Sequence, residues 1–168
     1  MPGGEDKYHW ALLIGPKREA PAPGVTVSGK RIHAKERIEG DGSGTSSWVY
    51  AEEDVDMSSV FMLLARVQIA KIRDTDGLLA LLRQVPIRGG EPGWNCIGWV
   101  KEALQVLKNN DSVMGRSSLE WQSVRDTAMW YVDKKAADHR FDGNAEPGQF
   151  DMARVPTYDT LQNTETVS

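Results

Sequence analysis

The chain has 168 residues, 40% of them hydrophobic and 26% charged, which is the balance of one soluble globular domain rather than of a disordered chain. A formal net charge of −4 argues against a dedicated nucleic-acid surface, which needs clustered and unbalanced Lys and Arg. The longest apolar stretch, residues 60–72, contains charged side chains and is shorter than the roughly 20 apolar residues that cross a bilayer. We therefore expect neither nucleic acid nor a membrane span among its interactions.

The first seven residues lack the apolar run of a signal peptide. Cys96 is the only cysteine, so the chain forms no internal disulfide. Both features favour a reducing, cytoplasmic location.

The first predicted element is a buried strand over residues 8–14, because this segment is short, aromatic and aliphatic, and is stopped by Gly15 and Pro16. His9 lies near its start. Residues 17–29 are rich in Pro and Gly and predict a long surface connection.

Residues 30–37 predict a second strand. Ile32 and Ala34 alternate with polar residues, so one face of the strand is apolar and the other presents His33.

Two further strand candidates follow, at residues 48–50 and within 60–72, where side chains alternate with a period of two. Together with the first two strands they predict a mainly antiparallel sheet of about four or more strands.

The period then changes to that of helices. Apolar residues recur at helical spacing over residues 78–85, after Asp76 as a capping residue and before Pro86 as a stop. Asn95 is a good N-cap for the next helix, which then begins at Cys96 and carries two apolar stripes. This helix is predicted to be central and buried.

Ser117 and Glu120 have the spacing of a capping box, which predicts a third helix that ends near residues 134–135. Gly, Pro, Asp, Thr and Asn dominate afterwards, so residues 141–168 predict a loosely packed or disordered tail behind a domain of residues 1–140. The fold class is α+β, with the sheet packed on the helix that bears Cys96.

Cys96, His9 and His33 form the candidate catalytic site. A helix start offers free backbone N–H groups and the positive end of the helix dipole, which favour a thiolate and then an oxyanion. An imidazole on an early strand is suited to act as the general base, and we assign this role to His9. His33 would orient the His9 ring, a role more often filled by a carboxylate or amide.

Plain structural roles compete with this assignment. A lone cysteine is usually a small buried hydrophobe, His9 can be a satisfied core histidine, and His33 can be an exposed one. The positions favour a site, because one cysteine at a capped helix start accompanies two histidines on early strands, while the third, His139, lies near the tail.

Three sequence blocks resemble those of the lecithin:retinol acyltransferase family: residues 8–15 (YHWALLIG), 31–33 (RIH) and 95–100 (NCIGWV). The resemblance implies a circularly permuted papain-like fold, with His9 as base, His33 as orienting residue and Cys96 as acylated nucleophile. The sequence is also similar to a small family known mainly from fungi, and this likeness implies no activity.

The chain departs from the lipid-processing members of that family, which have Glu-His after Asn-Cys and a hydrophobic anchor at one end. Here Ile97 and Gly98 follow Cys96, and residues 161–168 are polar. We therefore expect a soluble hydrolase or acyltransferase that acts on an ester, thioester or amide rather than on a phospholipid. Its small acyl or amide substrate would contact residues beside the site: Tyr8, Trp10, Trp94 and Asn95.

Three alternatives remain open at this stage. The same Cys/His site can serve a small-molecule biosynthetic step, such as a cyclisation or condensation. The domain can also be a non-catalytic papain-like module that binds a partner. Cys96, His9 and His33 can in principle ligate zinc, but their irregular spacing lacks a zinc signature, so we expect no metal and no cofactor.

Overall fold

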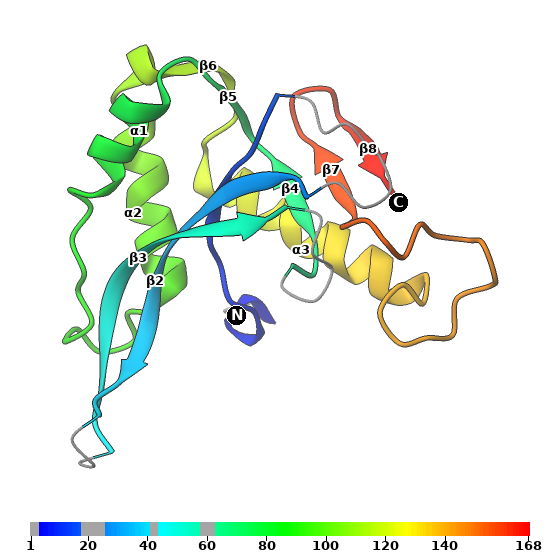
Figure 1. Cartoon of the computed structure of the whole chain (residues 1–168), viewed down its shortest axis with the longest axis horizontal. Coiled ribbons are helices and arrows are strands. Elements are labelled where there is room, and N and C mark those ends of the chain that lie inside the picture. Colours follow the sequence, from blue (N-terminus) through cyan, green and yellow to red (C-terminus); the bar gives the residue numbers. More distant parts are fainter. Residues whose placement is uncertain (1–3, 18–25, 41–43, 58–62) are drawn as a thin grey trace.

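The structure is a computed structural model that describes residues 4–17, 26–40, 44–57 and 63–168. These residues form an α+β fold with three α-helices and three small sheets, which are mainly antiparallel (Figure 1). In chain order the elements are η1 (Gly4–Lys7), β1 (Leu12–Ile14), β2 (Ser28–Ile38), β3 (Ser46–Asp56), β4 (Arg66–Gln68), β5 (Ala70–Ile72), α1 (Thr75–Leu82), α2 (Cys96–Lys108), η2 (Asp111–Val113), β6 (Met114–Ser117), α3 (Trp121–Ala137), β7 (Thr157–Asp159) and β8 (Thr164–Val167). The predicted α+β class is confirmed.

The largest sheet has the order β1-β2-β3 and is antiparallel throughout. Its register pairs Leu12 of β1 with Ile32 of β2, and His33 of β2 with Ala51 of β3. In Figure 1 the long β2–β3 ribbon runs from the lower left to the centre of the view, α1 and α2 lie at the left, and the β7–β8 hairpin lies at the right beyond the end of the ribbon. The first strand is shorter than predicted, since it begins at Leu12 rather than at residue 8.

The core lies between α2 and the β1-β2-β3 sheet. Trp99 of α2 is completely buried, and its ring lies 6.0 Å from that of Tyr50 on β3. Ile32 and Ala34 of β2 are also fully buried in this core, as the alternation along the strand predicts. Burial of these apolar surfaces is the main force that holds the helix on the sheet.

Helix α1 begins earlier than predicted, at Thr75 instead of residue 78, and its N-cap is Asp74 rather than Asp76. The Asp74 carboxylate accepts a hydrogen bond from the Gly77 backbone N–H at 2.9 Å. Asp76 lies inside the first turn, where its negative charge interacts favourably with the positive end of the helix dipole.

Helix α3 begins at Trp121, and the predicted capping box is wrong. Ser117 belongs to β6, where it pairs with Ala70 of β5. Glu120 occupies the N-cap position, but its side chain makes no capping hydrogen bond. Ser117 is thus part of a strand and does not cap the helix, so the capping-box spacing of the two residues is a coincidence.

The prediction of one sheet with four or more strands is also wrong. Part of the stretch 60–72 forms two short strands, and residues 60–62 lie outside the described residues. Strand β4 joins β7 and β8, while β5 pairs with β6, so the two strands belong to different sheets. Alternation indicates a strand but not its partner, which depends on contacts between distant residues.

The predicted loose tail is wrong for residues 155–167. Strands β7 and β8 form an antiparallel hairpin, and β7 pairs in parallel with β4, with Arg66 opposite Thr157. Val155 and Val167 are buried. The sequence signal was weak because these strands are short and mostly polar, so few apolar residues mark them.

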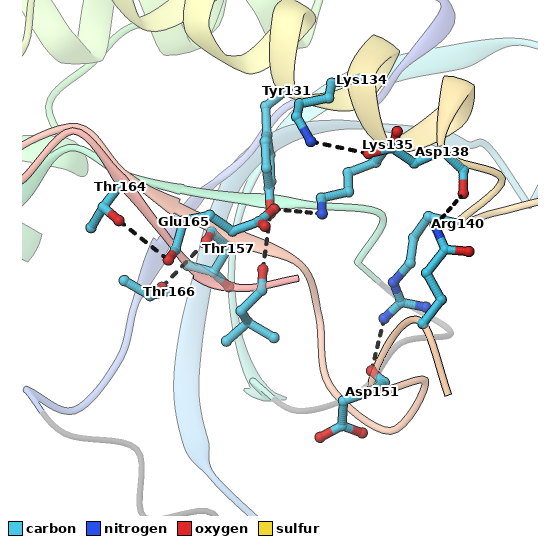
Figure 2. Close-up of polar contacts among 12 residues, drawn as sticks. Tyr131, Lys134, Lys135, Asp138, Arg140, Asp151, Thr157, Thr164, Glu165 and Thr166 are labelled. Atoms are coloured by element: carbon cyan, nitrogen blue, oxygen red, sulfur yellow. Dashed lines mark hydrogen bonds and ion pairs between the residues drawn. The ribbon is translucent and has the colours of Figure 1, made fainter. Parts of the chain in front are cut away.

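A buried polar cluster fastens this hairpin to α3 (Figure 2). Lys135 is 1% exposed, and its Nζ lies 2.5 Å from Glu165 Oε1 on β8. The Tyr131 hydroxyl donates to the same oxygen at 2.7 Å and lies 2.9 Å from the Val167 carbonyl oxygen. Burial opposes ionisation of Glu165, but the bonds from Lys135 and Tyr131 outweigh it and lower the pKa of that carboxyl.

Candidate functional site

Cys96 is the first residue of α2, as predicted. Asn95 caps the helix with extended backbone, and its side-chain oxygen accepts a hydrogen bond from the Ile97 N–H at 2.9 Å. The cap satisfies one of the free N–H groups, and the others stay available at the helix start. The Cys96 side chain is buried, with 6% of the residue exposed.

His9 and His33 are brought together. His33 lies in the middle of β2 and is 3% exposed, whereas His9 lies in the extended segment before β1 and is exposed. Nε2 of His9 is 2.5 Å from Nδ1 of His33, and the two rings meet edge to face with centroids 4.8 Å apart. One imidazole is therefore solvated, and the other is buried behind it.

The alternation of β2 separates this pair from the core helix. Ile32 and Ala34 pack in the core with α2, so His33 points to the opposite face of the sheet, together with Arg31 and Lys35. Among the hydrogen bonds of the described residues, none joins Cys96 to either imidazole. The structure thus unites two members of the predicted triad and leaves the third without a bond to them.

A hydrogen bond connects the two parts of the candidate site. Nδ2 of Asn95 lies 3.4 Å from Oδ1 of Asp6, in η1. Asp6 is three residues before His9, so the segment that carries the solvated imidazole is fastened at the start of the helix that carries Cys96.

Glu53 of β3 is a charged neighbour of the imidazole pair that the sequence analysis missed. Its carboxylate Oε2 lies 2.5 Å from Nη2 of Arg31, its Oε1 bonds to Lys35, and its Oε2 lies 3.4 Å from Nε2 of His33. The bonds from Lys35 and Arg31 lower the pKa of Glu53 to about 2. The only available signal was the cross-strand pairing of Arg31 with Glu53, which needs the register of β2 and β3.

Both imidazoles are held neutral. Burial lowers the pKa of His33 to about 4, with further depression from His9 and Arg31 that Glu53 only partly offsets. The pKa of His9 is also lowered, first by partial burial of its ring and then by the Arg31 charge. A neutral His9 can accept a proton at neutral pH, as a general base must.

The other predicted substrate-binding residues are mainly packed against neighbours. The Trp10 ring lies 5.5 Å from that of Trp121. The Trp94 ring meets that of Trp48 edge to face at 5.7 Å, and a Cβ on Gly98 would lie 2.9 Å from it. These two tryptophans therefore have structural partners, and Gly98 is the residue that lets Trp94 pack on α2.

A cavity of about 920 Å³ lies within the part of the chain that the structure describes. Tyr8 and His9 line it at the N-terminal segment, together with apolar side chains from β1, α2 and α3 such as Leu12, Leu104 and Val124. Neither Cys96 nor His33 is among its lining residues. The solvated imidazole thus faces a largely apolar space of the size of a small-molecule site.

No group of three or more His, Cys, Asp or Glu side chains among the described residues has the arrangement of a metal site. No helix in the described ranges is long and apolar enough to cross a membrane.

The fold and the site define an α+β protein with a hydrogen-bonded pair of imidazoles on one sheet and a lone thiol at a capped helix start. The chain belongs to DUF6914, a family of unknown function whose model matches residues 1–167. No curated protein and no solved structure matches it.

Proposed function

We propose that this chain is a cysteine-dependent hydrolase or acyltransferase that acts on an ester, thioester or amide, with Cys96 as nucleophile and His9 as base. The proposal includes a permuted papain-like arrangement, in which the helix that bears the thiol packs on a sheet and the base lies in the extended segment that leads into the first strand of that sheet. The observation that carries it is the 2.5 Å bond between His9 and His33. This bond leaves His9 with its other ring nitrogen available, and the lowered pKa of His9 favours its neutral form.

In the proposed reaction, the ring nitrogen of His9 that does not face His33 takes the proton from the Cys96 thiol. The thiolate attacks the carbonyl carbon, and backbone N–H groups at the start of α2 stabilise the oxyanion. His9 returns the proton to the leaving alcohol, thiol or amine. Water or an acceptor then attacks the acyl-enzyme with His9 again as base, which restores the free thiol.

The reaction requires Cys96 and His9 to approach each other. The bond between Asp6 and Asn95 supports this requirement, because it fixes the N-terminal segment at the helix start, three residues from the base. Catalytic hydrogen bonds are often long in the absence of substrate and tighten when it binds.

Alkylation kinetics test this proposal. Iodoacetamide labelling of Cys96 at neutral pH, followed by intact mass, should be faster than labelling of free cysteine and should slow in His9→Gln. His139→Gln is the matched control, because His139 is exposed and its ring bonds only to Asp142 among the described residues. Labelling no faster than that of free cysteine, and equal in the wild type and His9→Gln, would contradict the proposal.

A second candidate function has its own observation. His9 lines the 920 Å³ cavity and Cys96 does not, which favours proton transfer by His9 to or from an apolar small molecule, as in a cyclisation or condensation. In that case Cys96 is a packing residue.

Reactions in ¹⁸O-labelled water separate the two functions. With apolar ester and amide substrates, a product that gains solvent oxygen and disappears in Cys96→Ala supports the thiol hydrolase. A product without solvent oxygen that survives in Cys96→Ala but not in His9→Gln supports proton transfer.

A further inference from the structure

The buried end of the imidazole pair faces a carboxylate. Nε2 of His33 is 3.4 Å from Oε2 of Glu53, without the geometry of a hydrogen bond, and it is buried with no other partner among the described residues. Arg31 and Lys35 hold the Glu53 carboxylate in place from the same face of the sheet. Among the described residues, Glu53 is the carboxylate that forms an ion-pair contact with this nitrogen, so its charge favours the ring form that carries a proton there.

Two tautomer arrangements fit the short bond between the rings. In the first, His33 carries its proton on Nε2, and its Nδ1 accepts a hydrogen bond from Nε2–H of His9. In the second, both protons lie on Nδ1, so His33 donates to His9 and turns the lone pair of its own Nε2 toward Glu53. The second arrangement places a lone pair against a carboxylate in a buried site, which is unfavourable electrostatically.

We propose that Glu53 is a positioning residue that fixes these tautomers, so that Nδ1 of His9 is the nitrogen that accepts the proton in the reaction. The inference rests on the proposed function for the use of that proton, while the tautomers themselves do not depend on it. In the selected arrangement His9 Nδ1 carries a lone pair and points away from His33. In the other it carries a proton and cannot serve as a base.

The protons balance without any transfer from His9 to His33 or from His33 to Glu53. His9 accepts one proton on Nδ1 and becomes an imidazolium, while its Nε2–H stays bonded to the lone pair of His33 Nδ1. His33 keeps its proton on Nε2. The Glu53 charge stabilises the positive His9 ring through the intervening His33 ring. The proton leaves from the same Nδ1 in the second half of the reaction.

The ring ¹⁵N chemical shifts of the full chain, labelled with ¹⁵N-histidine, test the proposal near neutral pH, because protonated and unprotonated ring nitrogens give well-separated signals. His139→Gln and His9→Gln assign the three rings. We expect unprotonated Nδ1 and protonated Nε2 in both His9 and His33. In Glu53→Gln, whose amide can donate to His33 Nε2, the tautomer ratio should shift roughly tenfold toward Nδ1–H, because the negative charge that faces Nε2–H is lost.

Glu52→Gln is the matched control. Glu52 is the preceding residue of β3, points to the other face and bonds to Arg83, so its loss should leave the shifts unchanged. A proton on Nδ1 of His9 in the wild type overturns the proposal, and this measurement needs no variant. Unchanged shifts in a folded Glu53→Gln overturn the role of Glu53. If the tautomers are as expected but Cys96 is labelled slowly, the proposed thiol chemistry is refuted and the role of Glu53 in fixing the tautomers stands.

Discussion

Nζ of Lys135 lies 2.5 Å from Oε1 of Glu165, and this contact joins the last strand of the chain to the helix α3. The lysine head also lies 5.6 Å from the centre of the Tyr131 ring and 5.0 Å from that of Phe150, which completes an aromatic enclosure for its charge. An ammonium group in such a site depends on its carboxylate, because water cannot replace the partner.

Glu165→Gln should therefore destabilise the fold. Loss of one partner of a buried ion pair costs about 3–5 kcal/mol, and we expect about 2–3 kcal/mol here because the Glu165 side chain is 32% exposed. Urea unfolding followed by tryptophan fluorescence measures the change. Glu120→Gln, which removes the exposed partner of Lys108, should leave the midpoint close to that of the wild type. Equal effects of the two variants would show that Lys135 does not need its carboxylate.

Local patterns predicted the features of the site that depend on neighbours in sequence. The helix start at Cys96 follows from a capping residue before two apolar stripes, and the face of His33 follows from its place between Ile32 and Ala34. Both depend on spacing within a few residues, which the sequence displays directly.

Long-range contacts were outside the reach of these patterns. Strand β4 pairs with β7 across 91 residues, from Arg66 to Thr157, and no local signal connects such short segments. Glu53 was missed for the same reason, since its approach to His33 depends on the register between β2 and β3. The bonds from Lys135 and Tyr131 to Glu165 likewise turn a polar sequence into an ordered hairpin.

Gly29 is predicted to be intolerant of a side chain. A Cβ there would lie 2.7 Å from the backbone oxygen of Ile14 and 2.5 Å from Cγ of Met57, so β1 would have to move away from β2. Gly29→Ala should cost about 1–3 kcal/mol, the usual range for overpacking. Gly40→Ala is the control, because a Cβ there meets nothing within 4 Å. Similar thermal midpoints for both variants would contradict the close approach of the strands.

Asn95 has two separable roles, as the cap of α2 and as the partner of Asp6. Asn95→Ala removes both and should lower the free energy of unfolding by about 1 kcal/mol. Asn95→Ser keeps an oxygen for the cap and should recover most of that loss, but it cannot reach Asp6. If the contact with Asp6 supports the reaction, both variants should slow iodoacetamide labelling of Cys96, whereas a cap effect alone would spare Asn95→Ser.

The stability of the fold should decrease as the pH falls from about 6.5 to about 4, because burial lowers the pKa of His33 from 6.5 to about 4. In this pH window the unfolded chain binds a proton on His33 that the folded chain does not bind, so acid favours unfolding. The total loss in the free energy of unfolding is of the order of 3 kcal/mol. The lowered pKa of His9 acts in the same direction. Arg31 and Lys35 keep the site positive and Glu53 opposes them, but Glu53 stays ionised in this window because its pKa is about 2.

Urea midpoints between pH 6.5 and 5 measure the slope of stability against pH before most carboxyl groups titrate. His33→Gln should flatten it, and His139→Gln should not; an unchanged slope in His33→Gln would show that the buried imidazole is not what makes this fold sensitive to acid.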